Sequence, residues 1–341
     1  MKYFNVFAWD NGYDYDKFYT EDGGQKFPST IHRPKNTDNI LVNEEYKFKK
    51  NKMIISYKGN THFIGDYAIR QSGIGGHRNY EPDKYKDDSE IMKFIAGVNL
   101  LTQDQKVDIE TLVVGLSLHT YHDYKEDMED FLKDKTIKYY INGQKKSIQI
   151  NNVLVVPQSV GCYYNEILNG NGRIKDHELL NKRYGIIDIG GNTVDAFIGT
   201  GIDPVPETQA GLESGLSDAF KSVSDTIPYN IIQSDYLKGK DSSLYRKSKI
   251  KDLQEACEVQ FKLLAEDIYN DIIDVWNRQI GRVEEIYLTG GGALSVGQYL
   301  KKKFIEKSNK EVTIMGNPQM SNVTGYYKLG IYQSKEVVED A

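Results

Sequence analysis

The chain has 341 residues, a formal net charge of −6, 39% hydrophobic residues and 27% charged residues. This composition indicates a globular protein, because disordered chains have fewer apolar residues and a larger charge imbalance. The length is sufficient for two domains of ~100–200 residues each. The acidic balance argues against broad, sequence-independent binding to DNA, which requires clustered cations that neutralise phosphates.

The two cysteines, Cys162 and Cys257, lie far apart and lack metal-ligand spacing. A disulfide scaffold and a structural zinc site are therefore disfavoured. The N-terminal residues lack the apolar run of a signal peptide. No stretch of the sequence approaches the ~20 apolar residues that a membrane span requires. We expect a cytoplasmic protein that does not bind membranes.

The first half is expected to begin with a buried strand. Residues 3–9 are mostly apolar, and the following Asp10-Asn11-Gly12 favours a turn. The pattern then predicts hairpins and an exposed loop over 14–52 and a strand entering a helix at 61–68. Two helices, over 89–101 and 124–133, are expected on either side of a strand over 111–116. Strands over 137–141 and 153–156 and a helix over 158–169 follow.

The second half repeats the opening pattern after a polar break near residues 165–185. Residues 184–187 predict a strand, 188–193 (DIGGNT) a turn and 194–198 a second strand. A long amphipathic helix is expected over 251–277, followed by a strand over 285–288, three glycines and a helix over 295–306. Its apolar stripe is expected to consist of Cys257, Phe261, Leu264, Ile268, Ile272 and Trp276. The repetition suggests two related α/β domains.

Common nucleotide-binding and catalytic motifs are absent from the sequence. There is no GxxxxGK[ST], which excludes a P-loop, and no GxGxxG after the first strand, which disfavours a dinucleotide fold. HExxH and GxSxG are also absent. Two acidic glycine turns and a triple glycine remain as candidate sites.

The second acidic turn is the more specific of the two. Gly190, Gly191, Asn192 and Thr193 leave backbone N–H groups that can bind phosphate oxygens. Asp188, at the end of the strand, can hold a hydrated Mg²⁺. A purely structural turn is the alternative at this position, as it is for Asp10-Asn11-Gly12.

The triple glycine follows a predicted strand and precedes a predicted helix. Gly290, Gly291 and Gly292 can serve tight packing between the strand and the helix, or they can leave room for a flat purine against the backbone.

Together these motifs resemble the actin superfamily, which also contains Hsp70 chaperones and sugar kinases. The resemblance implies an α/β, actin-like fold of two related RNase H-like domains with a nucleotide in the interdomain cleft. Domain I is expected over residues 1–164, with a C-terminal helix over 323–341 packing back on it, and domain II over 165–322.

The resemblance also implies roles for individual residues. Asp10, Asn11, Gly12 and Lys17 match the first phosphate loop, in which Asp14 replaces the family's second glycine. Residues 155–159 (VVPQS) resemble the first connector between the domains, which places Gln158 where the family orients the attacking water.

Residues 188–195 resemble the second phosphate loop, and residues 288–294 (LTGGGAL) resemble the adenosine motif. Gly211, Glu213 and Gly215 are assigned to the ribose side, with a plain helix start as the alternative. Asp10 and Asp188 would both hold Mg²⁺ through water.

Within the superfamily the sequence most resembles the ParM/StbA-type plasmid-segregation actins. The matching segments are 64–68 (IGDYA), 184–195 (YGIIDIGGNTVD) and 317–330 (NPQMSNVTGYYKLG). The resemblance implies a slow Mg²⁺-dependent hydrolase of ATP or GTP that forms filaments. The filaments would segregate low-copy plasmid DNA through a ParR-like adaptor on a centromere-like site, without touching DNA directly.

Two other functions in the superfamily are alternatives. A small-molecule kinase would require a catalytic aspartate near an open sugar site, and a chaperone-like ATPase would require a substrate-binding domain beyond residue 341. For a filament, the exposed segment 34–52 is the candidate contact between subunits, and an ordinary solvated hairpin is its alternative.

Overall fold

The computed structural model describes residues 1–34, 50–72, 81, 83–175, 177–201, 203–239, 250 and 252–339. The chain divides into two compact units. Unit 1 consists of Met1–Arg173 with Val323–Ala341, and unit 2 consists of Ile174–Asn322. No helix in the described part of the chain is both long and apolar enough to cross a membrane.

Over the described residues, unit 1 contains a nine-stranded sheet in the order β3-β2-β1-β7-β9-β8-β5-β6-β4. The strands are β1 (Lys2–Asn11), β2 (Tyr15–Thr20), β3 (Gly23–Pro28), β4 (Ile31–His32), β5 (Met53–Tyr57), β6 (Asn60–Ile64), β7 (Lys106–Leu116), β8 (Lys135–Ile141) and β9 (Gln144–Pro157). β1 pairs antiparallel with β2, whereas β1, β7 and β9 are mutually parallel neighbours. The carboxyl ends of these three parallel strands therefore meet at one edge of the sheet.

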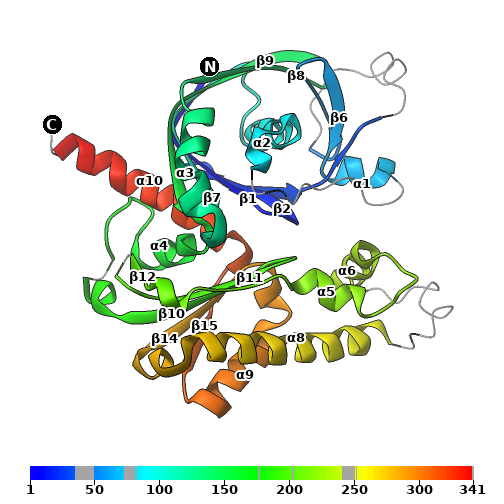
Figure 1. Ribbon diagram of the computed structural model, residues 1–341. Coiled ribbons are helices and arrows are strands. Elements are labelled where there is room, and N and C mark those ends of the chain that lie inside the picture. Colours follow the sequence, from blue (N-terminus) through cyan, green and yellow to red (C-terminus); the bar gives the residue numbers. More distant parts are fainter. Residues whose placement is uncertain are drawn as a thin grey trace. The chain divides into compact units, whose positions relative to one another are not determined.

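The helices of unit 1 cover both faces of this sheet. They are α1 (Asp66–Ser72), α2 (Asp88–Leu101), α3 (Leu118–Leu132), α4 (Gly161–Ile167) and α10 (Ser321–Glu339, in unit 1 from Val323), with short 3₁₀ turns η1 (Lys84–Lys86) and η2 (Gln158–Val160). Figure 1 shows α2 inside the curve of the sheet and α3 on the opposite face. Strands covered on both faces have nearly continuous apolar sequences, which explains the predicted buried run in β1. Trp9 of β1 packs against Phe94 of α2, with ring centroids 5.2 Å apart.

Unit 2 repeats the first part of this topology. Its sheet has the order β12-β11-β10-β14-β15, with β13 paired to β11. β10 pairs antiparallel with β11 and parallel with β14, as β1 does with β2 and β7. The strands are β10 (Arg183–Ile189), β11 (Val194–Thr200), β12 (Asp203–Pro204), β13 (Ala210–Leu212), β14 (Glu285–Thr289) and β15 (Glu311–Ile314). The predicted duplication is thus visible in the strand order.

The helices of unit 2 include the long amphipathic helix expected from the sequence. They are α5 (Leu216–Lys221), α6 (Tyr229–Leu237), α8 (Leu253–Trp276) and α9 (Gly297–Ser308), with 3₁₀ turns η3 (His177–Asn181), η4 (Pro206–Thr208), η5 (Asn277–Arg282), η6 (Gly291–Leu294) and η7 (Pro318–Met320). All residues of the predicted α8 stripe, from Cys257 to Trp276, are buried. Asp252 is the N-cap of α8, and its side chain accepts a hydrogen bond from the Glu255 N–H.

Several elements extend beyond their predicted ends. β1 continues through Asp10 and Asn11, because these residues pair with Lys17 and Asp16 of β2, so the turn itself starts at Gly12. β10 likewise includes Asp188 and Ile189. β9 begins at Gln144, within a polar stretch that pairs with β8. Pairing between strands therefore lengthens elements that apolar periodicity alone made too short.

The predicted subunit contact at 34–52 lies mostly outside the described residues, which resume at Lys50. The Lys50 ammonium donates a hydrogen bond to the side-chain oxygen of Gln25 in β3.

Candidate functional site

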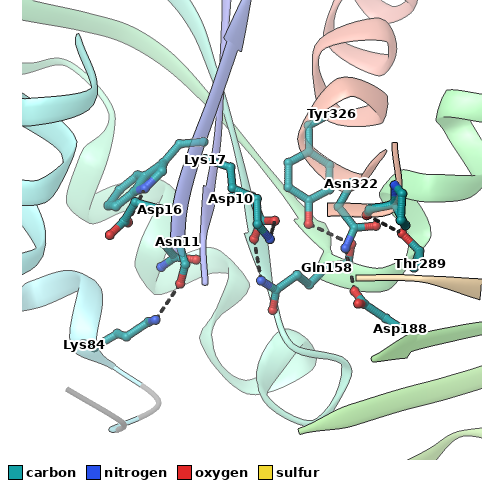
Figure 2. Close-up of polar contacts among 12 residues, drawn as sticks. Asp10, Asn11, Asp16, Lys17, Lys84, Gln158, Asp188, Thr289, Asn322 and Tyr326 are labelled. Carbon is teal, nitrogen blue, oxygen red and sulfur yellow. Dashed lines mark hydrogen bonds and ion pairs between the residues drawn. The ribbon is translucent and has the colours of Figure 1, made fainter. Parts of the chain in front are cut away.

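Asp10 is the centre of the polar site in unit 1. Its side chain is fully buried, and its two oxygens accept hydrogen bonds from Lys17 Nζ at 2.7 Å and from Gln158 Nε2 at 2.6 Å. Figure 2 shows the Asp10 carboxylate between these two donors. A buried carboxylate is costly unless it is paired and hydrogen-bonded, and Lys17 supplies the compensating charge.

Strand register explains how these side chains meet. Asp10 and Lys17 are direct partners in the β1–β2 hairpin, so their side chains lie on the same face of the sheet. Gln158 follows Pro157 at the end of β9, beside the end of β7. The Tyr326 hydroxyl of α10 donates to the main-chain oxygen of Gln158 at 2.7 Å. This hydrogen bond from α10 therefore holds the backbone at Gln158 in place.

The turn after Asp10 requires a glycine. A Cβ added to Gly12 would lie 2.7 Å from the main-chain oxygen of Tyr15. The turn borders a pocket whose lining includes Asn11, Gly12, Lys84 and Gln158. Two predicted binding residues and the predicted water-orienting residue thus share one pocket within unit 1.

Two carboxylates face each other at the polar site of unit 2. Asp188 of β10 pairs with Asp195 of β11, and Asn322 Nδ2 donates to Asp188 Oδ2 at 2.6 Å (Figure 2). Burial and, to a smaller extent, the charge of Asp188 together raise the pKa of Asp195 to about 7. A divalent cation would relieve this repulsion. Among the described residues, no group of three or more His, Cys, Asp or Glu side chains could hold a metal ion, so a cation here would retain water ligands.

The turn between β10 and β11 is held by its own backbone and by the start of α5. Gly190 N donates to Thr193 O at 2.9 Å, while Ser217 N donates to Gly191 O at 2.7 Å. The side-chain nitrogen of Asn192 is buried and has no hydrogen-bond partner. An unsatisfied buried donor is rare in a native protein. Its position in this turn fits an anionic ligand that the protein itself does not provide.

The glycines after β14 serve different purposes. Gly290 has a φ of +84°, and a Cβ there would lie 2.3 Å from Asp188 Oδ1. A Cβ at Gly292 would lie 2.3 Å from the Ile189 side chain. These two glycines fit the packing explanation offered by the sequence. At Gly291 a Cβ would meet its nearest atom, on Gln319, at 3.6 Å, which is an ordinary van der Waals contact, so close packing does not require a glycine at this position.

Replacing Gly290 with alanine should destabilise the protein strongly. The positive φ costs about 1–2 kcal/mol for an L-residue, and the clash with Asp188 adds about 1–3 kcal/mol. Thermal unfolding would measure the loss. Gly281→Ala is the control, because a Cβ there meets nothing within 4 Å. Equal melting temperatures for the two variants would contradict this account of Gly290.

The residues predicted on the ribose side fall into two groups. A Cβ at Gly215 would lie 2.6 Å from Gly191 O, so this glycine allows α5 to approach the second turn. Gly211 and Glu213 are exposed, and Gly211 pairs with Asp195 across β13 and β11. The structure thus connects Gly215 directly with the turn and leaves Gly211 and Glu213 accessible.

Comparison with known families identifies both halves of the chain. Residues 8–161 match the N-terminal domain of actin-like proteins, and residues 186–302 match the C-terminal domain of the archaeal MreB-like actin homologue. The chain belongs to the actin-like proteins. None of the curated proteins matches it.

Solved structures share the fold of this actin-like protein over nearly their whole length. The apo pSK41 ParM protein matches with a TM-score of 0.72 and 20% identity, covering 99% of this chain and 100% of that one. The archaeal actin homologue Ta0583 in complex with ADP has a TM-score of 0.72 and 20% identity, with coverages of 98% and 99%. A 15-stranded ParM filament from Clostridium botulinum has a TM-score of 0.72 and 23% identity, with coverages of 97% and 99%. The predicted fold and the predicted resemblance to ParM-type actins are confirmed.

Sequence reasoning missed the residues that orient the predicted ones. Asn322 and Tyr326, both on α10, lie within a segment that contributed to the family resemblance without any assigned role. Asp195 was included in the second turn motif but not among the site residues. Lys84, which contacts Asn11, lies in a segment, residues 71–88, that the sequence predicts only as a loop rich in glycine, tyrosine and charge.

Proposed function

We propose that this actin-like protein hydrolyses ATP or GTP in the presence of Mg²⁺ and assembles into filaments that segregate low-copy plasmid DNA. The observation that supports it most is the pairing of the buried Asp10 with Lys17 and Gln158 beside a glycine turn. The solved structures with the same fold include an ADP complex of Ta0583 and a ParM filament.

In unit 1, Lys17 and the turn at Asn11 and Gly12 would bind phosphate oxygens. The side chain of Lys17 is 13% exposed while it is paired with Asp10, so part of it remains accessible to a ligand. The side-chain N–H of Gln158 donates a hydrogen bond to Asp10. The amide oxygen of Gln158 can therefore orient a water molecule. A neutral amide is a poor general base, which suits slow hydrolysis.

In unit 2, the turn that Gly190 begins would bind phosphates through the backbone N–H groups of Gly191, Asn192 and Thr193 and through the unsatisfied Asn192 amide, while the Gly190 N–H holds the turn closed. Asp188 would hold the waters of a hydrated Mg²⁺, and Asp195 opposite it adds negative charge. Asp10 would reach Mg²⁺ only through water, since both of its oxygens already accept hydrogen bonds. Bound Mg²⁺ would neutralise charge on the phosphate oxygens. Gly291, together with Gly211 and Glu213, would contact the nucleoside.

Plasmid segregation would require contacts other than those with the nucleotide. We propose self-association into filaments and an adaptor that resembles ParR and binds a centromere-like DNA site. The net charge of −6 fits a filament that does not itself neutralise DNA phosphates.

Light scattering with Mg²⁺ and either ATP or GTP, followed by negative-stain microscopy of the same samples, tests this function. A rise that later decays, with filaments at its peak, is the expected result. A flat trace with both nucleotides despite measurable binding would contradict self-assembly and favour a kinase-like enzyme. Absence of nucleotide binding would contradict the proposed function altogether.

A further inference from the structure

A second lysine contacts the first glycine turn and has no role in the function proposed above. Lys84 Nζ donates to the main-chain oxygen of Asn11 at 2.6 Å and lies 4.4 Å from the ring centroid of Tyr13. Figure 2 shows its side chain extending toward Asn11. Lys84 begins η1, shortly before α2, so a residue distant in sequence contacts the Asn11 carbonyl and the Tyr13 side chain of this turn.

Placing an ammonium at this position is energetically costly. Lys84 is only 8% exposed, and a buried ammonium destabilises a protein unless it is hydrogen-bonded or paired. Burial lowers the pKa of Lys84, and the nearby Glu90, Asp16 and Asp10 carboxylates oppose that effect. A hydrophobic side chain would fill the same space at lower cost, so the presence of lysine calls for a role that needs its charge or its donors.

The hydrogen bond acts on the backbone of the turn itself. The Asn11 oxygen belongs to the planar peptide that joins Asn11 to Gly12. The hydrogen bond to this oxygen fixes the plane of that peptide. The contact between the same ammonium and the Tyr13 ring restrains Tyr13, the residue after Gly12. The same ammonium also borders the pocket that Gly12 and Gln158 line. Lys84 thus adds positive charge beside a turn proposed to bind phosphate.

We propose that Lys84 is a positioning residue for the first phosphate turn, which it orders by holding the Asn11 carbonyl and the Tyr13 ring. This inference rests on the proposed nucleotide binding. A residue that orders a phosphate turn contributes to the affinity for nucleotides, which carry phosphates. It does not contribute to the affinity for a free nucleoside, which carries none. A residue needed only for folding would change both affinities together.

The test compares wild type with K84M, K84Q and K84R by calorimetric titration. Each protein is titrated with the triphosphate that the wild type prefers and with the corresponding nucleoside. K84M removes both charge and donors and should bind the triphosphate about 10–100-fold more weakly, with nucleoside affinity unchanged. K84Q retains donors without charge, and K84R retains both, so K84R should recover more of the affinity than K84Q.

K86M is the matched control. Lys86 lies in the same 3₁₀ turn, but its ammonium is exposed and pairs with Asp127 at 2.7 Å. K86M should bind both ligands like wild type. If K84M does not fold, as judged by thermal unfolding, the comparison of K84Q and K84R decides.

Three outcomes would overturn the assignment of Lys84. They are an unchanged triphosphate affinity in the folded Lys84 variants, a parallel loss of nucleoside and triphosphate affinity, or an equal loss in K86M. Failure of the wild type to bind any nucleotide would instead reject the proposed function.

Discussion

Gln158→Ala is expected to slow nucleotide hydrolysis by about 100-fold, the usual contribution of a residue that positions a reacting group. Nucleotide affinity should change far less, because the amide contacts Asp10 and lies beside the turn without forming it. Single-turnover hydrolysis and equilibrium binding, measured on the same samples, would separate the two effects. If filaments form, those of the variant should persist longer after the nucleotide is added.

Gln144→Ala provides the control for this substitution. Gln144 is exposed at the start of β9, in the same unit and the same strand that leads to Gln158. Its hydrolysis rate should equal that of wild type. A rate for Gln158→Ala within a few-fold of wild type would remove Gln158 from the reaction. Loss of binding and hydrolysis in equal proportion would instead assign it to the binding of the nucleotide.

Much of the fold follows from local sequence patterns. The apolar run from Phe4 to Trp9 predicts a strand covered on both faces, and the α8 stripe has the spacing of a helix packed on a sheet. Both are confirmed. The first turn of α3, from Leu118, and the polar start of β9 at Gln144 were missed, since neither has the apolar periodicity on which the prediction rests. The start of β9 is determined by its pairing with β8.

The sequence yields candidate site residues only where they lie in short motifs, such as the glycine turns and the acidic residues at strand ends. The contacts that orient those residues come from distant parts of the chain. Asn322 is 134 residues from Asp188, and Lys84 is 73 residues from Asn11. No local pattern marks such partners, because an asparagine in a helix or a lysine in a loop is usually a solvated surface residue. Only the fold shows that both are buried.

Asp195 should make the stability of the ligand-free protein strongly dependent on pH. Burial, together with the Asp188 charge, raises its pKa from 3.8 to about 7. Between these pH values the folded protein retains a proton that the unfolded chain has released, so the free energy of unfolding falls as the pH rises. The loss is complete above pH ~7. It amounts to at most about 4 kcal/mol, at ~1.4 kcal/mol per pKa unit.

Asp195→Asn removes this ionisation, so the variant should be more stable than wild type at pH 8. With a chelator present and no nucleotide, we expect its melting temperature to exceed that of wild type by several degrees, at ~2–4 °C per kcal/mol. The difference should shrink by half or more at pH 5, where the folded wild type has regained its proton. Asp225→Asn, an exposed carboxylate of the same unit, is the control and should show no such dependence. A difference between Asp195→Asn and wild type that is equal at both pH values would mean that Asp195 is ionised throughout, and that Asp188 and Asp195 do not form a repulsive pair in the absence of a cation.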